Sequence, residues 1–281
     1  MDVVQVDHTQ ADVLVVDPVT RRPIGRPWLS LAIDVASRCV VGFYVGMERP
    51  CLLLHGDSNI GKTQIIAKFR RKHPDEFDEG RGIETRPIVS MQMPPTPDQH
   101  RFYSTLLFEL NAPHNPAASL AVLERLARDL LRRITPSMLI VDEIHHLLAG
   151  TYREQRAALN LLKFLANDLR ASIVLVGTDD AVLALQSDAQ MVSRFTPFEI
   201  PRWHESEAFR RLLSAFERIL PLRRPSGLAQ REIAQYILAA SSGLTGEVSR
   251  ILNTAAECAI RRGDETIRLE HLEQVSSAAI Q

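Results

Sequence analysis

A glycine-framed lysine directly after an apolar run is the feature that most limits how this chain can fold. The run is Cys51–His55, and it leads into the pattern Gly56-x-x-x-x-Gly61-Lys62-Thr63. Glycines adopt backbone angles that a Cβ would forbid, so consecutive N–H groups of such a loop can point at a polyphosphate. The pattern therefore predicts a strand, a phosphate-binding loop and a helix that begins near Lys62.

The residues of this loop have expected roles in holding a nucleoside triphosphate. We expect Lys62 to place its charge on the outer phosphates and the Thr63 hydroxyl to ligate Mg²⁺. The positive end of the following helix adds to the same site. The predicted cofactors are ATP and Mg²⁺, and the predicted nucleotide-binding residues of the loop are Gly56, Asp57, Ser58, Asn59, Ile60, Gly61, Lys62 and Thr63.

A carboxylate pair follows a second apolar run, Met138–Val141. Asp142 and Glu143 stand where such a strand leaves a parallel sheet, and ligands of open α/β sheets bind at that end. We expect Asp142 to hold a Mg²⁺-bound water and Glu143 to orient the water that attacks the γ-phosphate. A solvated acidic loop would explain the pair taken alone, but its combination with the phosphate loop favours a catalytic site.

A third apolar run, Ile173–Val176, ends in Gly177-Thr178-Asp179. We expect Thr178 to project its hydroxyl between the phosphate loop and the carboxylate pair, where it can position the attacking water. The alternative is a cap for a helix that starts near Asp179–Asp180, because Thr and Asp commonly cap helices. The first interpretation is the one that we favour.

The composition excludes several classes of protein. The formal net charge is −1, so a contact with nucleic acid has to come from a local basic patch. Cys39, Cys51 and Cys258 form no C-x-x-C pair, which argues against a metal site or a secreted disulfide framework. The chain has no secretory signal and no run of about 20 apolar residues. We expect a cytoplasmic protein without membrane contact.

The pattern of strands and helices divides the chain into three expected domains. Residues 1–49 show short strand patterns separated by turn residues, which predicts a β-rich segment. Residues 50–201 alternate strand and helix patterns up to a last strand at Phe198–Ile200, which is typical of a parallel α/β sheet. Residues 202–281 show helical patterns alone and predict a small helical lid.

The motifs occur in an order that resembles one known family. Besides the phosphate loop and the carboxylate pair, the chain contains Ser193-Arg194-Phe195 and the stretch from Gly243 to Arg250. Together they resemble AAA+ ATPases, and more closely the TniB/TnsC group of transposition regulators, over about residues 50–281. The resemblance implies an α/β fold: an AAA+ P-loop NTPase core with a parallel sheet and a C-terminal all-helical lid.

The resemblance assigns roles to two arginines. It implies that Arg194 is an arginine finger that reaches the γ-phosphate of a neighbouring subunit, and that Arg250 is the lid arginine that senses the nucleotide. A finger supplied by a neighbour neutralises developing charge only when that neighbour is docked, which couples hydrolysis to assembly. From the residues alone, Arg194 is a surface charge beside Phe195.

The resemblance also implies partners. Relatives in this group assemble on DNA with ATP and connect target DNA to a transposase. The expected partners are therefore duplex DNA, a DDE transposase of the TniA/TnsB type and further copies of this chain in a ring or filament. The loops around Pro94–Arg101 and Ala112–Pro116 occupy positions where relatives present residues to DNA, and Arg101 is the candidate contact. Such phosphate contacts are independent of base sequence and sensitive to salt.

The first residues resemble a different family. Val3–Thr9 and Gly25–Arg38 are similar to the start of the DDE integrase core of TniA/TnsB, an RNase H-like fold, over about residues 1–47. Asp7 matches its first catalytic carboxylate, and Asp34 belongs to the neighbouring strand. That chemistry needs three carboxylates and two Mg²⁺ ions, so this partial segment predicts no active nuclease. We interpret the chain as a fusion left by deletion between neighbouring transposition genes.

Two histidines follow the carboxylate pair. Adjacent residues of a helix point about 100° apart, so His145 and His146 form a poor metal chelate. We expect them to lie on a helix surface or to support the residues of the site.

The leading interpretation is an ATPase that binds and hydrolyses ATP, oligomerises on target DNA and recruits or activates a DDE transposase. One alternative is a fusion remnant that acts as a nucleotide-binding or interaction module without turnover. The other is a different AAA+ task, such as helicase loading. The transposase-like start argues against helicase loading, because genes fused by deletion were usually neighbours.

Overall fold

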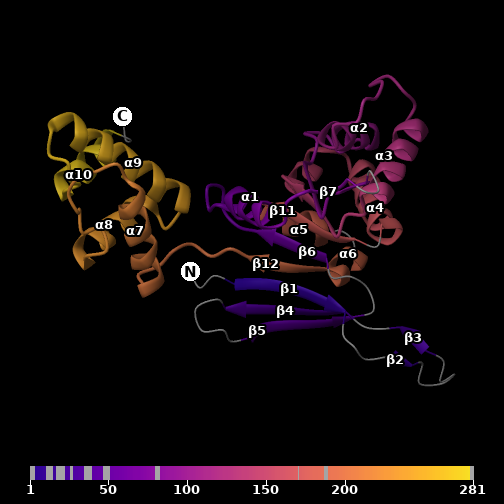
Figure 1. The fold of residues 1–281 in the computed structure, drawn as a ribbon, viewed down its shortest axis with the longest axis horizontal. Helices are drawn as coiled ribbons and strands as arrows, with labels where there is room; N and C mark the ends of the chain where they lie inside the picture. The colour runs from indigo at the N-terminus through magenta and orange to yellow at the C-terminus, as the bar shows by residue number, and fades with distance from the viewer. Residues whose placement is uncertain are drawn as a thin grey trace. The chain divides into compact units, whose positions relative to one another are not determined.

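The computed structural model describes residues 4–10, 15–16, 23–25, 28–34, 40–46, 51–79, 83–169, 171–186 and 189–278. Contacts divide the chain into two units, which are considered separately below. The first, here called the α/β unit, holds residues 3–56 and 62–199. The second, here called the helical unit, holds residues 57–61 and the described residues from 200 to 278 (Figure 1).

A five-stranded sheet forms the centre of the α/β unit. Its strands are β6 (Cys51–His55), β9 (Ile88–Gln92), β10 (Met138–Asp142), β11 (Ser172–Gly177) and β12 (Phe195–Glu199). They lie in the order β12-β6-β11-β10-β9, and every neighbouring pair is parallel. All residues of β11 are buried, as a strand covered on both faces requires. The predicted strands are confirmed, although β12 begins three residues earlier than the sequence pattern predicts.

Helices pack on this sheet and enclose its apolar core. They are α1 (Lys62–Lys72), α2 (Gln99–Glu109), α3 (Leu120–Ile134), α4 (Tyr152–Leu169), α5 (Asp180–Gln186), α6 (Ala189–Arg194) and the 3₁₀ helix η1 (Ile144–Ala149). The core is continuous from the strands into the buried leucines of α3 and α4, such as Leu131 and Leu162. None of the described helices combines the length and the apolar character needed to cross a lipid bilayer.

Helix α2 corrects one sequence-based expectation. The stretch up to Arg101 reads as a loop in the sequence, but the structure places Arg101 in the first turn of α2. The helix begins where the side chain of Asp98 accepts a hydrogen bond from the N–H of His100. Phe102, Tyr103, Leu106 and Leu107 bury one face of it. The pattern was obscured by the prolines that precede the helix, which favour a loop reading.

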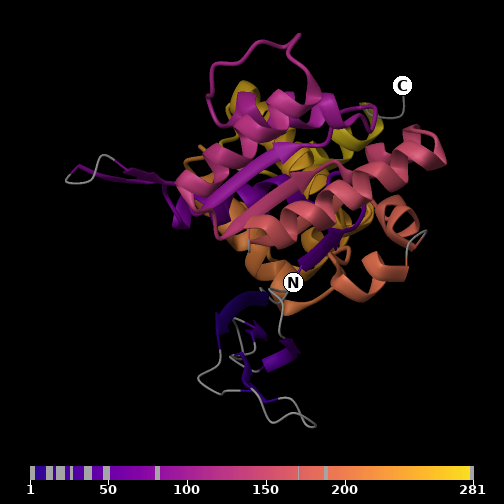
Figure 2. The same ribbon diagram turned by 90° about the vertical axis from the view of Figure 1, so that its right-hand side faces the viewer.

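A short hairpin leaves the body of the α/β unit. Its strands, β7 (Glu76–Asp78) and β8 (Ile83–Thr85), pair in antiparallel fashion. Figure 2 shows the hairpin projecting away from the five-stranded sheet. The sequence pattern predicts neither strand, because three residues are too few to establish an alternation of apolar and polar side chains.

The N-terminal residues form antiparallel sheets. Strands β1 (Val4–Gln10), β4 (Trp28–Asp34) and β5 (Val40–Gly46) lie in the order β1-β4-β5, and β2 (Val15–Val16) pairs with β3 (Pro23–Gly25). Asp7 is opposite Leu31 in the register of β1 and β4, and Asp34 is opposite Val4. The predicted β-rich character of this segment is confirmed, as is the position of Asp34 on the neighbouring strand.

Four helices make up most of the helical unit: α7 (Glu207–Ile219), α8 (Arg231–Ser241), α9 (Thr245–Arg262) and α10 (Leu269–Ala278). Their apolar faces form a core of their own around Phe209, Ile237 and Leu252. His271 is fully buried in it. Its Nδ1 accepts a hydrogen bond from the N–H of Arg268, and its Nε2 lies 3.2 Å from Asp264 Oδ2. Both ring nitrogens are therefore engaged in fixing the start of α10.

An ion pair joins α3 to α4 at the edge of the apolar core. The guanidinium of Arg128 donates two hydrogen bonds to Asp168, each of 3.0 Å, and Arg132 donates another of 2.7 Å. Arg128 also lies over the ring of Phe164, 4.6 Å from its centroid. The hydrogen bonds from Arg128 are the main reason that the pKa of Asp168 is lowered. Paired and charge-assisted bonds of this kind are among the strongest in proteins.

Replacing Asp168 with Asn is expected to lower the free energy of unfolding at pH 7 by roughly 1–3 kcal/mol. Because the pKa of Asp168 is lowered in the fold, the ionised carboxylate stabilises the protein above the ordinary Asp value of about 3.9. That contribution is lost as the pH falls through the lowered value. Urea unfolding at a series of pH values should show the largest difference from wild type near neutrality.

Asp129→Asn on the exposed side of α3 serves as the control. Asp129 lies 3.8 Å from Arg125 and 4.0 Å from Arg132 on the same helix, and exposed pairs of this kind contribute only a few tenths of a kcal/mol. Equal losses for the two variants would contradict the assignment.

Candidate nucleotide-binding site

The loop between β6 and α1 has the backbone that phosphate binding requires. Gly56 and Gly61 have φ angles of 149° and 106°, and Asn59 between them has a φ of 63°. Helix α1 begins at Lys62, as the sequence predicts. The Nζ atom of Lys62 donates a hydrogen bond of 2.7 Å to the carbonyl oxygen of Gly56. The lysine thus folds back over the first glycine of the loop.

The middle of this loop, Asp57–Gly61, belongs by its contacts to the helical unit. Asp57 accepts two hydrogen bonds from Arg202, of 2.6 and 2.9 Å, in a bidentate ion pair. The N–H of Gly246 donates to the carbonyl oxygen of Asn59 at 2.8 Å. A Cβ on Gly246 would lie 3.0 Å from that same oxygen, which explains why glycine stands there. All of these contacts lie within the helical unit, to which Asp57–Gly61 belong.

Arg250, the predicted nucleotide-sensing arginine, is part of the same network. Its Nε donates a 2.7 Å hydrogen bond to one carboxylate oxygen of Glu247. The other oxygen of Glu247 accepts from the side-chain amide of Asn59 at 3.4 Å. Glu247 therefore connects Arg250 to the phosphate loop. The sequence analysis missed Arg202 and Glu247, because nothing in their spacing separates them from ordinary surface charges.

Asp142 is the buried carboxylate of the site. Asp142 is the last residue of β10 and is only 8% exposed. Its Oδ1 accepts a 2.8 Å hydrogen bond from the N–H of Glu143. Burial raises its pKa, and the negative charge of Glu143 adds to the effect. The hydrogen bond and the nearby charge of Lys62 act in the opposite direction. A cation bound at this point would offset the cost of burying the carboxylate.

Glu143 and Thr178 flank Asp142 at the carboxyl edge of the sheet. Glu143 follows β10 in the left-handed conformation, with a φ of 57°. Thr178 follows β11, which lies between β6 and β10. Its hydroxyl oxygen is enclosed and has no hydrogen-bond partner among the residues that the structure describes. The side chain thus forms no helix cap there, and the enclosed hydroxyl keeps its hydrogen-bonding capacity unused within the described residues.

The structure brings some of the predicted residues together and separates others. Lys62, Asp142, Glu143 and Thr178 all lie where parallel strands β6, β10 and β11 end. Arg194 instead ends α6, directly before β12 begins opposite Cys51. It lies at the amino edge of the sheet, where its Nη1 is 3.4 Å from the carbonyl oxygen of Lys163. A strand of this length separates the two edges by roughly 16 Å.

Arg101, the candidate DNA contact, lies apart from these residues on α2. Its Nη1 donates a 3.1 Å hydrogen bond to the hydroxyl of Thr96. The side chain also lines a hollow of about 290 Å³ with Met93, Pro94 and Ser104. Its residue is exposed, so a phosphate group could reach the guanidinium.

The residues present fit a nucleotide with Mg²⁺. Asp142 and Thr63, an exposed residue at the start of α1, carry oxygen atoms of the kind that Mg²⁺ prefers and would hold the ion. The raised pKa of Asp142 marks a carboxylate whose charge is not fully compensated in the protein alone. The loop geometry and the start of α1 provide for the phosphates.

Comparison with protein families agrees with this geometry. The family described as "Bacterial TniB protein" matches residues 44–205, which is more than half of the chain. A second family, the TnsB C-terminal domain, matches residues 5–56. The predicted relation to these two groups is confirmed. Since the second family is described as a C-terminal domain, the match of residues 1–47 to the start of the integrase core stays a prediction.

A curated relative supports the second match. The transposition protein TnsB of transposon Tn7 from Escherichia coli is 49% identical over 69 residues. That alignment covers 23% of this chain and 10% of the relative. The similarity is therefore local and concerns only a small part of TnsB.

Solved structures share the fold. Cdc6p from Pyrobaculum aerophilum has a TM-score of 0.58 at 19% identity, covering 82% of this chain and 60% of its own. The ORC2 protein of Aeropyrum pernix in its ADP form has a TM-score of 0.58 at 17% identity, covering 82% of this chain and 63% of its own. The ORC1 protein of the same organism, in complex with DNA, has a TM-score of 0.57 at 18% identity, covering 83% of this chain and 60% of its own. The chain thus has the α/β fold of AAA+ ATPases and spans less than two thirds of these structures.

Replacing Asp142 with Asn is expected to raise the melting temperature at pH 7 without nucleotide, by roughly 2–4 °C. Because the pKa of Asp142 is raised in the fold, its ionised form costs stability above the ordinary Asp value. The amide still accepts the hydrogen bond from Glu143. The difference should shrink as the pH falls and Asp142 takes up a proton.

Thermal unfolding at several pH values measures this effect, with Asp129→Asn, at an exposed carboxylate of α3, as the control. A lower melting temperature for Asp142→Asn at pH 7 would show that the carboxylate stabilises the fold, against the assignment.

Proposed function

This chain belongs to the TniB family, and we propose that it is an ATP-hydrolysing regulator of DNA transposition. Lys62, Asp142, Glu143 and Thr178 would form the catalytic site, together with Arg194 from a neighbouring copy. The observation that carries the proposal is their placement: a phosphate loop, a carboxylate pair and an enclosed hydroxyl lie at the ends of three adjacent parallel strands. A solvated acidic loop would not bury Asp142 opposite a lysine.

The reaction is the attack of water on the γ-phosphorus of ATP. The bond from the γ-phosphorus to the bridging oxygen breaks, its electron pair stays on ADP, and the water proton passes to Glu143 and then to the released phosphate. Lys62 holds the outer phosphates, and Thr178 orients the water. Bound Mg²⁺, held through Thr63 and Asp142, would neutralise charge on the β- and γ-phosphates. Arg250 would sense the bound nucleotide, in competition with Glu247.

The position of Arg194 favours action on a second subunit. It stands at the amino edge of the sheet, while its own phosphate loop follows the carboxyl edge. Within one copy the two lie farther apart than an arginine side chain can span. A neighbouring copy in a ring or filament could present Arg194 to the γ-phosphate, which would make hydrolysis depend on assembly.

The remaining parts of the proposal concern partners and domains. Residues 1–49, 50–201 and 202–281 would act as the transposase-like segment, the nucleotide-binding core and the lid. Duplex DNA and a DDE transposase of the TniA/TnsB type are the proposed partners; the family and the TnsB-like segment support them. Arg101 is the proposed DNA contact. Because the segment resembles only part of TnsB, we propose no strand-transfer activity for this chain.

The purified protein is expected to hydrolyse ATP with Mg²⁺ and to do so faster when duplex DNA is present. The stimulation by DNA should weaken as the salt concentration rises. Lys62→Ala should abolish hydrolysis by removing the phosphate contact. Glu143→Gln should lower kcat by at least about 100-fold and still bind ATP. Phosphate release and binding of a fluorescent ATP analogue measure the two effects.

Arg125→Ala, on the exposed side of α3, is the control for both variants. If wild type and Lys62→Ala release phosphate at the same background rate, the chain is a remnant that keeps the fold without turnover.

Mixing two inactive variants tests the arginine finger. Arg194→Ala keeps an intact phosphate loop, and Lys62→Ala keeps an intact Arg194. If Arg194 acts on the neighbouring subunit, mixed assemblies contain competent interfaces and regain about a quarter of the wild-type rate at equal amounts. No recovery, although light scattering shows that both variants assemble, would place Arg194 outside the catalytic interface.

A further inference from the structure

Glu143 has an imidazole neighbour that the proposed reaction does not yet use. Its carboxylate Oε2 lies 3.2 Å from Nδ1 of His145. The backbone of Glu143 is fixed, because its N–H donates to Asp142 and its carbonyl oxygen accepts from His146. The side chain itself is 41% exposed. The fixed backbone therefore leaves the carboxylate group free to turn, and its position depends on the contacts that its own oxygens make.

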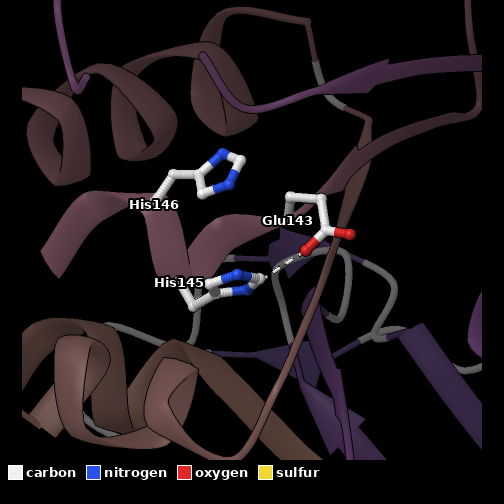
Figure 3. A group of neighbouring side chains, drawn as sticks. All are labelled: Glu143, His145 and His146. Atoms are coloured by element: carbon white, nitrogen blue, oxygen red, sulfur yellow. Dashed lines mark ion pairs between the residues drawn. The ribbon is translucent and has the colours of Figure 1, made fainter. Parts of the chain in front are cut away.

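The two adjacent histidines have different contacts. Figure 3 shows the ring of His145 beside the carboxylate of Glu143, with His146 as the third member of the group. One nitrogen or oxygen atom of each of the three side chains lies within 4.8 Å of those of the other two. Nδ1 of His146 lies 2.9 Å from the carbonyl oxygen of Met93, the residue that follows β9. His146 therefore ties η1 to the end of the neighbouring strand. His145 is the histidine of this pair that lies within ion-pair distance of Glu143.

The contact between His145 and Glu143 is close but poorly directed. Nδ1 of His145 is enclosed by protein and forms no hydrogen bond of good geometry within the described part of the chain. An enclosed polar atom without a partner costs free energy. A small rotation of Glu143 would supply the bond. The imidazole therefore draws the carboxylate toward itself and restricts where it can stand.

The surroundings of His145 point toward the water site. A Cβ on Gly177 would lie 3.5 Å from the backbone nitrogen of His145, so the start of η1 packs against the end of β11. Thr178 is the next residue, and its hydroxyl is the other enclosed atom without a partner at this edge. One enclosed polar group, Nδ1 of His145, thus stands on the 3₁₀ helix that Glu143 precedes, and another, the Thr178 hydroxyl, stands directly after the adjacent strand.

We infer that His145 is a positioning residue, which holds the carboxylate of Glu143 by a hydrogen bond from Nδ1 at the place where it accepts the proton of the attacking water. The inference rests on the proposed ATPase function. His145 itself touches neither nucleotide nor water. Its loss should lower the rate of the chemical step and leave nucleotide binding unchanged, because Lys62 and the phosphate loop are not affected.

Conservative substitutions separate this role from packing. The amide nitrogen of Asn can occupy nearly the same place as Nδ1 of a histidine, whereas that of Gln matches Nε2. His145→Ala should lower kcat about 10- to 100-fold with KM for ATP changed less than about twofold. His145→Asn should recover most of kcat, and His145→Gln should recover little. If His145 had a merely structural role, kcat would instead follow the melting temperature of the variants and would show no such order.

The double variant Glu143→Gln with His145→Ala completes the test. If His145 acts through Glu143, the double variant has the same residual rate as Glu143→Gln alone. A further loss in the double variant, or equal rates for the Ala and Asn variants, would overturn the inference. If Glu143→Gln is inactive while His145→Ala keeps the wild-type rate, only the inference on His145 fails. If Glu143→Gln hydrolyses ATP like wild type, the proposed function fails with it.

Discussion

The parallel pairing of β6, β11 and β10 is the constraint on which the site depends. Since β11 pairs with both neighbours, the phosphate loop, Thr178 and the carboxylate pair leave the sheet at one edge. A contact across that edge supports the arrangement: Nδ1 of His55, at the end of β6, lies 2.8 Å from Asp179 Oδ1 after β11. The apolar strands contribute the free energy of burial, and the polar residues at their ends use the resulting rigid frame.

Much of this frame could be predicted from the sequence, because buried parallel strands are continuous apolar runs with polar residues directly after them. Cys51–His55 and Met138–Val141 are of this kind. The order of the strands in the sheet could not be predicted from apolar runs alone, and the structure is what shows it. Helix α2 was missed because its N-terminus follows a proline-rich stretch, and its burial depends on packing against α3 and β9.

The contacts around the phosphate loop could not have been predicted from local patterns. Arg202 pairs with Asp57 although 145 positions separate them, and Glu247 reaches Asn59 across 188. The sequence around Arg202 and around Glu247 does not differ from the sequence around residues that form ordinary surface ion pairs, such as Arg211 with Glu207 on α7. The stretch from Gly243 to Arg250 could be identified as a motif from the sequence. The reason for a glycine at position 246 could not, because it lies in the close contact with the carbonyl oxygen of Asn59 that the structure shows.

The distribution of unsatisfied polar groups supports the assignment of the site. Away from it, buried or partly buried charges are well paired: Arg128 holds Asp168, and His271 uses both ring nitrogens. At the carboxyl edge of the sheet, by contrast, burial raises the pKa of Asp142. The Thr178 hydroxyl and Nδ1 of His145 are enclosed there and have no hydrogen-bond partner among the residues that the structure describes. The hydroxyl of Tyr103 shows that such an atom can also occur elsewhere. Three uncompensated groups at one edge nevertheless place the cost in stability where a nucleotide, its metal ion and a water molecule would offset it.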